Sequence, residues 1–199
     1  MSYAIIGFGK IGHALAGAFA RKGIEVSVAT TRDPKSFAAD AAAVGPNIIP
    51  KTLVEAVKAD IIFLAVRFEA HPDVAKALTS WKGKTVVDVT NAYGVPPEKL
   101  GGQPSSKFVA QAFTGARLVK GFNHLGAPKL EQDPSVHGGE RVVFLASDDD
   151  AAAEEIGALA EKLGFAPIQL GDLSEGGLLV QARGNSWGRL IFKDLVKFN

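Results

Sequence analysis

The chain of 199 residues contains no cysteine, which excludes disulfides, zinc–thiolate sites, thiol nucleophiles and cysteine-ligated iron–sulfur clusters. It has no excess of charge either: 22 basic and 21 acidic residues are dispersed along it, so we expect no nucleic-acid partner. The amino terminus lacks the basic and apolar segments of a signal peptide. The apolar runs, such as Ile61 to Val66, are too short to cross a bilayer. We therefore expect a cytoplasmic protein with no membrane contact.

The chain also lacks the residue spacings of metal sites and hydrolases. Its four histidines form neither H-x-x-x-H nor H-E-x-x-H, the patterns that place two ligands on one helix face. No serine combines a G-x-S-x-G motif with a histidine at the sequence spacing of a catalytic triad. We expect no metal site and no hydrolase triad.

Short β-branched apolar segments alternate with alanine-rich segments of helical period. Continuous apolar character predicts strands that are covered on both faces, as in a parallel sheet. The expected strands are Tyr3–Gly7, Glu25–Ala29, Asn47–Ile49, Asp60–Val66, Lys84–Thr90, Arg117–Phe122, Arg141–Ala146 and Ala166–Leu170. The expected helices include Lys10–Lys22, Pro34–Val44, Thr52–Lys58, Ser105–Phe113 and Asp149–Leu163.

This alternation predicts right-handed βαβ units and one α/β domain over residues 1–199. We expect a Rossmann-type, doubly wound parallel sheet with a helical C-terminal extension. The extension, from about residue 120 to 199, continues the sheet and covers the acceptor side. Its last part, Asp172–Asn199, is expected to be helical with a break near Arg183-Gly184-Asn185. The proline- and glycine-rich stretch Asn91–Ser106 reads as a long loop of functional importance.

The sequence G-F-G-K-I-G follows the first expected strand and opens the first expected helix. In this context the first glycine makes a tight turn, the second admits a pyrophosphate, and the third lets helix and strand pack closely. The helix N-terminus adds free N–H groups and positive partial charge. The loop is expected to bind a dinucleotide through Gly7, Phe8, Gly9, Lys10, Ile11 and Gly12.

The second expected strand ends in threonines and an arginine, where an NAD-binding fold carries a carboxylate for the ribose. Hydroxyls and a guanidinium donate to a 2′-phosphate, so the pattern favours NADP(H) over NAD. Asp33 leaves an alternative open, since its carboxylate at the ribose would invert the preference. The expected phosphate pocket comprises Thr30, Thr31, Arg32, Lys35 and Ser36.

Two later strands end toward the same crevice, because carboxyl ends of parallel strands meet at one edge of a sheet. F-L-A-V-R-F and V-D-V-T-N-A-Y contain these ends. The alternative for Asn91 is that it only begins a turn. The residues expected near the nicotinamide ribose are Ala65, Val66, Arg67, Asn91 and Ala92.

Six stretches over nearly the whole chain carry a resemblance to a known family. They are G-F-G-K-I-G, A-T-T-R, L-A-V, D-V-T-N, V-K-G-F-N (Val119–Asn123) and G-F-A-P-I-Q-L-G-D-L (Gly164–Leu173). Together they resemble the NADPH-dependent reductases related to the deazaflavin (coenzyme F-420):NADP oxidoreductases. The resemblance implies an NADP-dependent oxidoreductase that passes a hydride between nicotinamide and a deazaflavin, a flavin or another small acceptor. It also implies a homodimer.

The resemblance further places the acceptor crevice between the sheet and the C-terminal part. Phe122, Asn123 and the loop Leu125–Pro128 would line it. The deazaflavin enzymes have a histidine near the end of this strand, whereas this chain has Asn123 followed by His124. The implied catalytic residues are Asn123 and His124, with His124 donating to the charge that develops on the acceptor. The alternative for His124 is a loop histidine whose ring is satisfied by backbone carbonyls.

Two other functions stay open at this point. One is an NADPH reductase of a small imine or keto substrate, a class that generally carries a large helical second domain, for which this chain is short. The other is a redox sensor that binds NADPH and NADP⁺ with different affinities and turns nothing over. Turnover with an acceptor separates the sensor from both enzymes.

Overall fold

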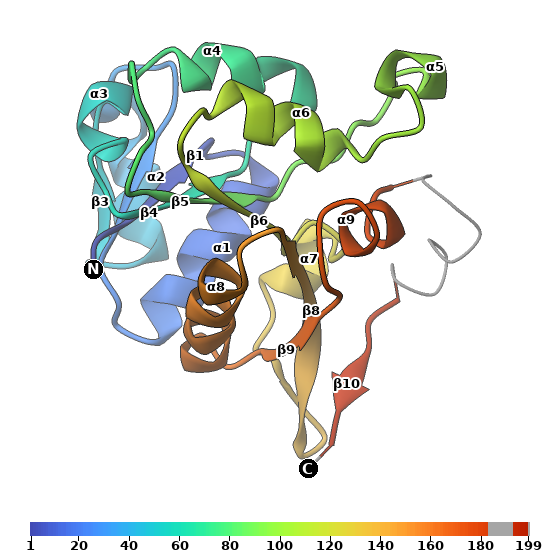
Figure 1. Cartoon of the computed structure of the whole chain (residues 1–199). Helices are drawn as coiled ribbons and strands as arrows, with labels where there is room; N and C mark the ends of the chain where they lie inside the picture. The colour runs from blue at the N-terminus through green and yellow to red at the C-terminus, as the bar shows by residue number, and fades with distance from the viewer. Residues whose placement is uncertain (183–192, 199) are drawn as a thin grey trace.

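The computed structural model describes residues 1–182 and 193–198, and its centre is a single mixed sheet (Figure 1). Six parallel strands lie in the order β3-β2-β1-β4-β5-β6, which confirms the doubly wound Rossmann arrangement. Their bounds are β1 Tyr3–Ile6, β2 Val26–Ala29, β3 Ile48–Pro50, β4 Ile61–Leu64, β5 Thr85–Asp88 and β6 Arg117–Gly121. Every strand predicted from an apolar run is present.

The C-terminal extension continues this sheet, but in the antiparallel sense. β8 (Gly139–Ser147) runs antiparallel to β6, and β9 (Ala166–Gln169) lies parallel to β8. The short strands β7 (Ser135–Val136) and β10 (Val196–Lys197) also pair antiparallel with β8. The sheet is therefore mostly parallel, with its sense reversed beyond β6.

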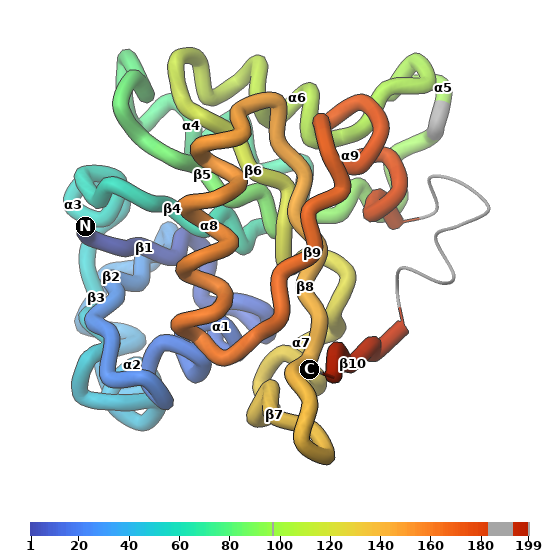
Figure 2. The backbone as a smooth tube through the Cα atoms, turned by 60° about the horizontal axis from the view of Figure 1, so that its bottom comes forward, coloured from blue at the N-terminus to red at the C-terminus, as the bar shows by residue number. Residues whose placement is uncertain are grey.

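The helices cover both faces of the sheet (Figures 1 and 2). One face carries α1 (Lys10–Arg21), η1 (Pro34–Phe37), α2 (Ala38–Val44), α7 (Ala127–Leu130) and α8 (Asp150–Lys162). The other face carries α3 (Leu53–Ala56), η2 (Phe68–Ala70), α4 (His71–Ala75), α5 (Pro97–Leu100) and α6 (Ser105–Ala112). Each layer buries its own apolar cluster, as the continuous apolar strands predict.

Helix α1 shows how this packing follows from the sequence. Leu15 and Phe19 lie one turn apart on the same face and are completely buried. Burying each side chain contributes about 1.5–3 kcal/mol. The Phe19 ring meets Phe63 of β4 edge-on, with centroids 5.6 Å apart, so α1 and its N-terminus are fixed over the sheet.

The tail differs from the expected helix over residues 172–199. In its described part it forms only the short helix α9 (Gly176–Leu179) and ends in β10. The middle of the expected helix, residues 183–192, lies outside the described residues. Among the described residues, no helix has the length and apolar character needed to span a bilayer.

Candidate cofactor and acceptor site

The glycine loop between β1 and α1 has the geometry of a phosphate cradle. Gly7 adopts a φ of +101°, and a Cβ there would lie 2.3 Å from the Ala65 carbonyl oxygen. A Cβ on Gly12 would lie 1.9 Å from the Gly7 carbonyl oxygen. Around Gly9, in contrast, a Cβ would meet nothing within 4 Å. The chain therefore needs glycine at positions 7 and 12, whereas the space above Gly9 is open.

The first turn of α1 leaves its N–H groups available. Gly9 is the N-cap and offers no side-chain hydrogen bond, and the helix begins at the exposed Lys10. Free N–H groups and the helix dipole favour an anion at such an end. The exposed backbone of Gly9 and this helix end meet at one point, at the carboxyl edge of β1.

The loop after β2 is ordered by local hydrogen bonds. Thr30 Oγ1 accepts from the Arg32 N–H at 2.9 Å. Asp33 caps η1, since its Oδ1 accepts from the Lys35 N–H at 2.8 Å. The carboxylate that left the NAD alternative open is thus used as a helix cap in this structure. The side chains of Thr31, Arg32, Lys35 and Ser36 are all exposed.

Arg32 belongs to a stack that reaches the phosphate loop. Its guanidinium carbon lies 5.4 Å from the centroid of the buried Phe37 ring. Phe37 contacts Phe8 at 5.9 Å between centroids, and Phe8 stacks on His13 of α1 at 4.0 Å. Phe8 is 6% exposed, so its side chain supports the loop from below. The stack fixes where the exposed cation stands relative to α1.

A cleft of about 420 Å³ opens beyond the ends of β4 and β5. Five of the residues expected near the cofactor meet there: Ile11, Ala65, Val66, Arg67 and Asn91. Ala92 does not, and lines a neighbouring cleft instead. The sequence prediction missed Phe68, Glu69, Val89, Thr90 and Tyr93, which complete the wall. The sequence indicated these residues only through their position next to the ends of the two strands that were expected at the cofactor crevice.

The neighbouring cleft, of about 370 Å³, lies between the loop of residues 92–103 and α9. Its walls are mainly apolar, with the amides of Gln103 and Gln181 among them. Gln181 Oε1 also accepts a hydrogen bond from the Ser105 N–H, which ties the tail to the start of α6. The expected long loop over residues 91–106 is interrupted by α5 and ends at the start of α6. It forms one wall of the cleft, and the tail forms the other.

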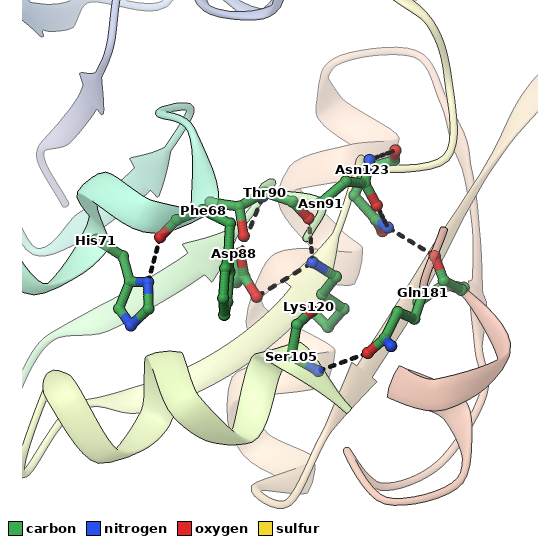
Figure 3. A network of polar contacts seen from close by, with 10 residues as sticks. Phe68, His71, Asp88, Thr90, Asn91, Ser105, Lys120, Asn123 and Gln181 are labelled. Carbon is green, nitrogen blue, oxygen red and sulfur yellow. Dashed lines mark hydrogen bonds and ion pairs between the residues drawn. The ribbon is translucent and has the colours of Figure 1, made fainter. Parts of the chain in front are cut away.

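Asn91 and Asn123 form a mutual amide pair between the ends of β5 and β6 (Figure 3). Asn91 Nδ2 donates to the main-chain carbonyl of Asn123 at 2.8 Å, and Asn123 Nδ2 donates to Asn91 Oδ1 at 3.0 Å. Asn123 Nδ2 also donates to the Val180 carbonyl at 2.7 Å. Asn123 thereby connects the cofactor side of the sheet with the segment that follows α9.

A buried ion pair, which the sequence prediction missed, lies beside this amide pair. Lys120 Nζ is 3.1 Å from Asp88 Oδ2, and both side chains are 0% exposed. Lys120 Nζ also donates to the Thr90 carbonyl. Burial lowers the pKa of Lys120, and the Asp88 charge opposes this shift.

His124 is buried next to the extension of the sheet. It is 3% exposed and meets the Phe144 ring of β8 edge-on at 4.9 Å. Neither ring nitrogen has a hydrogen-bond partner of normal geometry among the described residues. Burial lowers the pKa of His124 to about 4, against a smaller opposing contribution from the Val142 backbone, so the ring is neutral at pH 7.

The residues near His124 in the sequence lie partly in the core and partly at the surface. The expectation that Phe122 lines a crevice is wrong for its side chain, which is 0% exposed between the rings of Phe63 and Phe165. Aromatic core packing accounts for this position. Ala127 and Pro128 lie against the phosphate loop, where they line a cleft of about 530 Å³ with Phe8, Gly9, Lys10, His13 and Glu131.

Comparison with known families gives a match over the N-terminal part of the chain, somewhat less than half of its 199 residues. Residues 2–92 match the family of NADP oxidoreductases described as coenzyme F420-dependent. This segment contains the phosphate loop, the Arg32 loop and both strand ends at the 420 Å³ cleft.

Solved structures extend the similarity over the whole chain. Protein SMa0349 of Sinorhizobium meliloti is 36% identical with a TM-score of 0.92, over 99% of this chain and 96% of that one. A candidate F420-dependent NADP reductase of Arthrobacter sp. FB24 is 28% identical with a TM-score of 0.70, over 87% of this chain and 86% of that one.

A curated relative, the metalloreductase STEAP3 of Rattus norvegicus, is 30% identical over 175 residues. The match covers 85% of this chain but 34% of the metalloreductase. The chain therefore spans about a third of the length of the curated relatives it matches.

Proposed function

From the match of residues 2–92 to the coenzyme F420-dependent NADP oxidoreductases, we propose that the chain is a member of this family and passes a hydride between NADP(H) and a flavin-like or other small planar acceptor. One observation carries the proposal. An exposed cation, an open phosphate cradle and a 420 Å³ cleft follow one another along the carboxyl edge of the sheet. This is the order in which a 2′-phosphate, a pyrophosphate and a nicotinamide riboside occur in NADP.

In this proposal the two ends of the cofactor are held by different chemistry. The exposed hydroxyls and cations of the loop after β2 bind the 2′-phosphate, with Arg32 as the charge-assisted donor. The first turn of α1 binds the pyrophosphate above Gly9. The segment Ala65–Arg67, together with Asn91, surrounds the nicotinamide riboside, and Ala92 lines the neighbouring cleft. The exposure of the Arg32 loop and the open space above Gly9 support this assignment.

The acceptor is proposed to lie in the 370 Å³ cleft between residues 92–103 and α9. Ala92 lines this cleft, while Asn91 and Tyr93 line the cofactor cleft, so the two ligands share one wall. Bound NADPH supplies the hydride, and the protein holds the reacting carbons at about 3–3.5 Å. The apolar walls exclude water from that contact.

We propose that His124 acts as a neutral hydrogen-bond donor near the acceptor and that Asn123 orients Asn91. The ring is buried, and neither ring nitrogen has a hydrogen-bond partner of normal geometry among the described residues. This supports such a role, since buried polar groups are otherwise paired. His124→Ala is expected to lower turnover and to leave the Kd for NADPH unchanged. An unchanged turnover number removes His124 from the reaction.

The experiment that tests the function is NADPH oxidation by the purified protein, with NADH in parallel. The acceptors are a deazaflavin coenzyme, FMN, FAD, a quinone, a ferric chelate and a small cyclic imine. Turnover with NADPH and a flavin-like acceptor supports the proposal, whereas turnover with the imine alone supports the imine reductase. Oxidation of NADH at an equal rate contradicts the assignment of Arg32.

A second candidate function is a redox sensor. The hydrogen bonds from Asn91 through Asn123 to Val180 favour it, because they offer a direct route from the cofactor cleft to the tail. A sensor binds NADPH and NADP⁺ with different affinities and oxidises NADPH with none of the acceptors. Calorimetry with both forms of the cofactor distinguishes it from the enzyme.

We also propose a homodimer. The exposed apolar side chains Leu195 and Phe198 flank β10, which is the terminal strand in the sheet order. Sedimentation equilibrium tests this, and a monomer at all concentrations contradicts it.

A further inference from the structure

Two of the family-like motifs share an internal spacing that the proposed function does not use. In D-V-T-N and K-G-F-N a charged residue stands three positions before an asparagine. In the sheet, Asp88 and Lys120 are register partners on neighbouring parallel strands. The two asparagines that follow them, Asn91 and Asn123, form the amide pair. The motifs therefore build two cross-strand links, an ion pair and an amide pair (Figure 3).

The ion pair is unusual for this molecule. Among the ion pairs between described residues, only Lys120–Asp88 has both side chains 0% exposed. Removing two charges from water costs about as much as their attraction returns, so a buried pair gives little net stability. Stability alone is thus a poor reason for a buried lysine at this place.

The ion pair binds both the backbone N–H and the backbone carbonyl of Thr90. Asp88 Oδ1 accepts from the Thr90 N–H at 2.9 Å, and Lys120 Nζ donates to the Thr90 carbonyl. Thr90 and the adjacent Asn91 line the 420 Å³ cleft. The ion pair is therefore connected to the cleft wall through a single residue.

We propose that Lys120 and Asp88 form a positioning unit for the nicotinamide half of the cofactor. They fix the turn at Thr90, and the amide pair then sets the orientation of Asn91 in the cleft. In the proposed function the adenosine half lies at the ends of β1 and β2, which β4 separates from β5 in the sheet order. Its binding should therefore not depend on the unit. The inference rests on the proposed function, since it assigns a role within the same cofactor site.

The test compares two ligands on the double variant Lys120→Met/Asp88→Val. This variant removes both charges together, which leaves neither partner buried and unpaired. NADPH reports on the whole cofactor site, and adenosine 2′,5′-bisphosphate reports on the adenosine half alone. The control is Arg117→Met/Glu155→Gln, which removes the partly exposed ion pair at the opposite end of β6.

Calorimetry is expected to show that the double variant binds NADPH about tenfold more weakly, the equivalent of one lost hydrogen bond. Binding of adenosine 2′,5′-bisphosphate stays at the wild-type level, and the control binds both ligands as the wild type does. Wild-type NADPH affinity in the double variant overturns the inference. If the wild type binds neither ligand, the proposed function itself is wrong. If the double variant does not fold, the same two ligands are measured on Asp88→Asn. The inference then requires that NADPH binding weakens while binding of adenosine 2′,5′-bisphosphate does not.

Discussion

The two ends of the candidate cofactor site are built in opposite ways. The loop after β2 consists of exposed side chains, and hydrogen bonds between near neighbours in sequence order it. The ends of β5 and β6 are buried, and partners 32 residues apart hold them together. Recognition of one phosphate needs only a few charges on a local turn. Orientation of a reacting ring needs groups that the sheet itself fixes.

The largest effect is expected at the phosphate loop, between the two regions. Gly12→Ala places a Cβ 1.9 Å from a backbone oxygen, so it should lower the free energy of unfolding by about 3 kcal/mol or more. Gly9→Ala has open space around it and should leave stability unchanged, yet it should abolish binding of both NADPH and NADH. Urea unfolding and calorimetry on the two variants check this. Equal stability losses would contradict the geometry of the loop.

The next effect concerns the buried region and is a dependence on pH. The pKa of His124 is about 4 in the fold and about 6.5 when unfolded, so the unfolded chain binds a proton first as the pH falls. The fold should lose about 3 kcal/mol between pH 6.5 and pH 4 from this group. His124→Leu should flatten that loss in urea titrations. Identical pH profiles for the variant and the wild type would mean that the ring is hydrated in the fold.

A comparable test on the exposed region is Arg32→Ala. A charge-assisted hydrogen bond contributes about 1.5–3 kcal/mol, so the Kd for NADPH should rise about 10- to 100-fold and the Kd for NADH should not change. Because the loop is exposed, salt should weaken NADPH binding in the wild type more than in the variant. Lys76→Ala, which removes an exposed cation that lines neither the cofactor cleft nor the acceptor cleft, is the matched control.

The smallest effect should come from the ring beneath Arg32. Phe37→Leu removes the cation–π contact, which contributes about 0.5–1 kcal/mol at an exposed site. The Kd for NADPH should therefore rise about threefold, with no change for NADH. An equal rise for both cofactors would show that Phe37 supports the phosphate loop rather than the guanidinium.

The local structure of the exposed region could be predicted from the sequence far better than that of the buried one. The glycine motif and the Arg32 loop depend on contacts between near neighbours, so their residue types and order are enough to identify them. The strands β1 to β6 were also predictable, because each is a short run of apolar residues between polar ones.

The role of Lys120 could not be predicted in this way. A lysine within V-K-G-F-N looks like an ordinary strand residue until the register with Asp88 is known. The prediction of a helical tail was wrong for a related reason. Strand β10 is two residues long, and it is defined by its pairing with β8 rather than by a local sequence pattern. Phe122 was expected to line the acceptor crevice because of the resemblance, but its ring packs in the core between Phe63 and Phe165.

The open space above Gly9 has a practical consequence for a chain without cysteine. Gly9→Cys would introduce the sole thiol of the molecule at a place where its side chain meets no protein atom within 4 Å. The N-terminus of α1 lowers the pKa of a thiol and makes it reactive toward alkylating reagents. The alkylation rate would then report the positive potential at this helix end, without a ligand and without a chromophore.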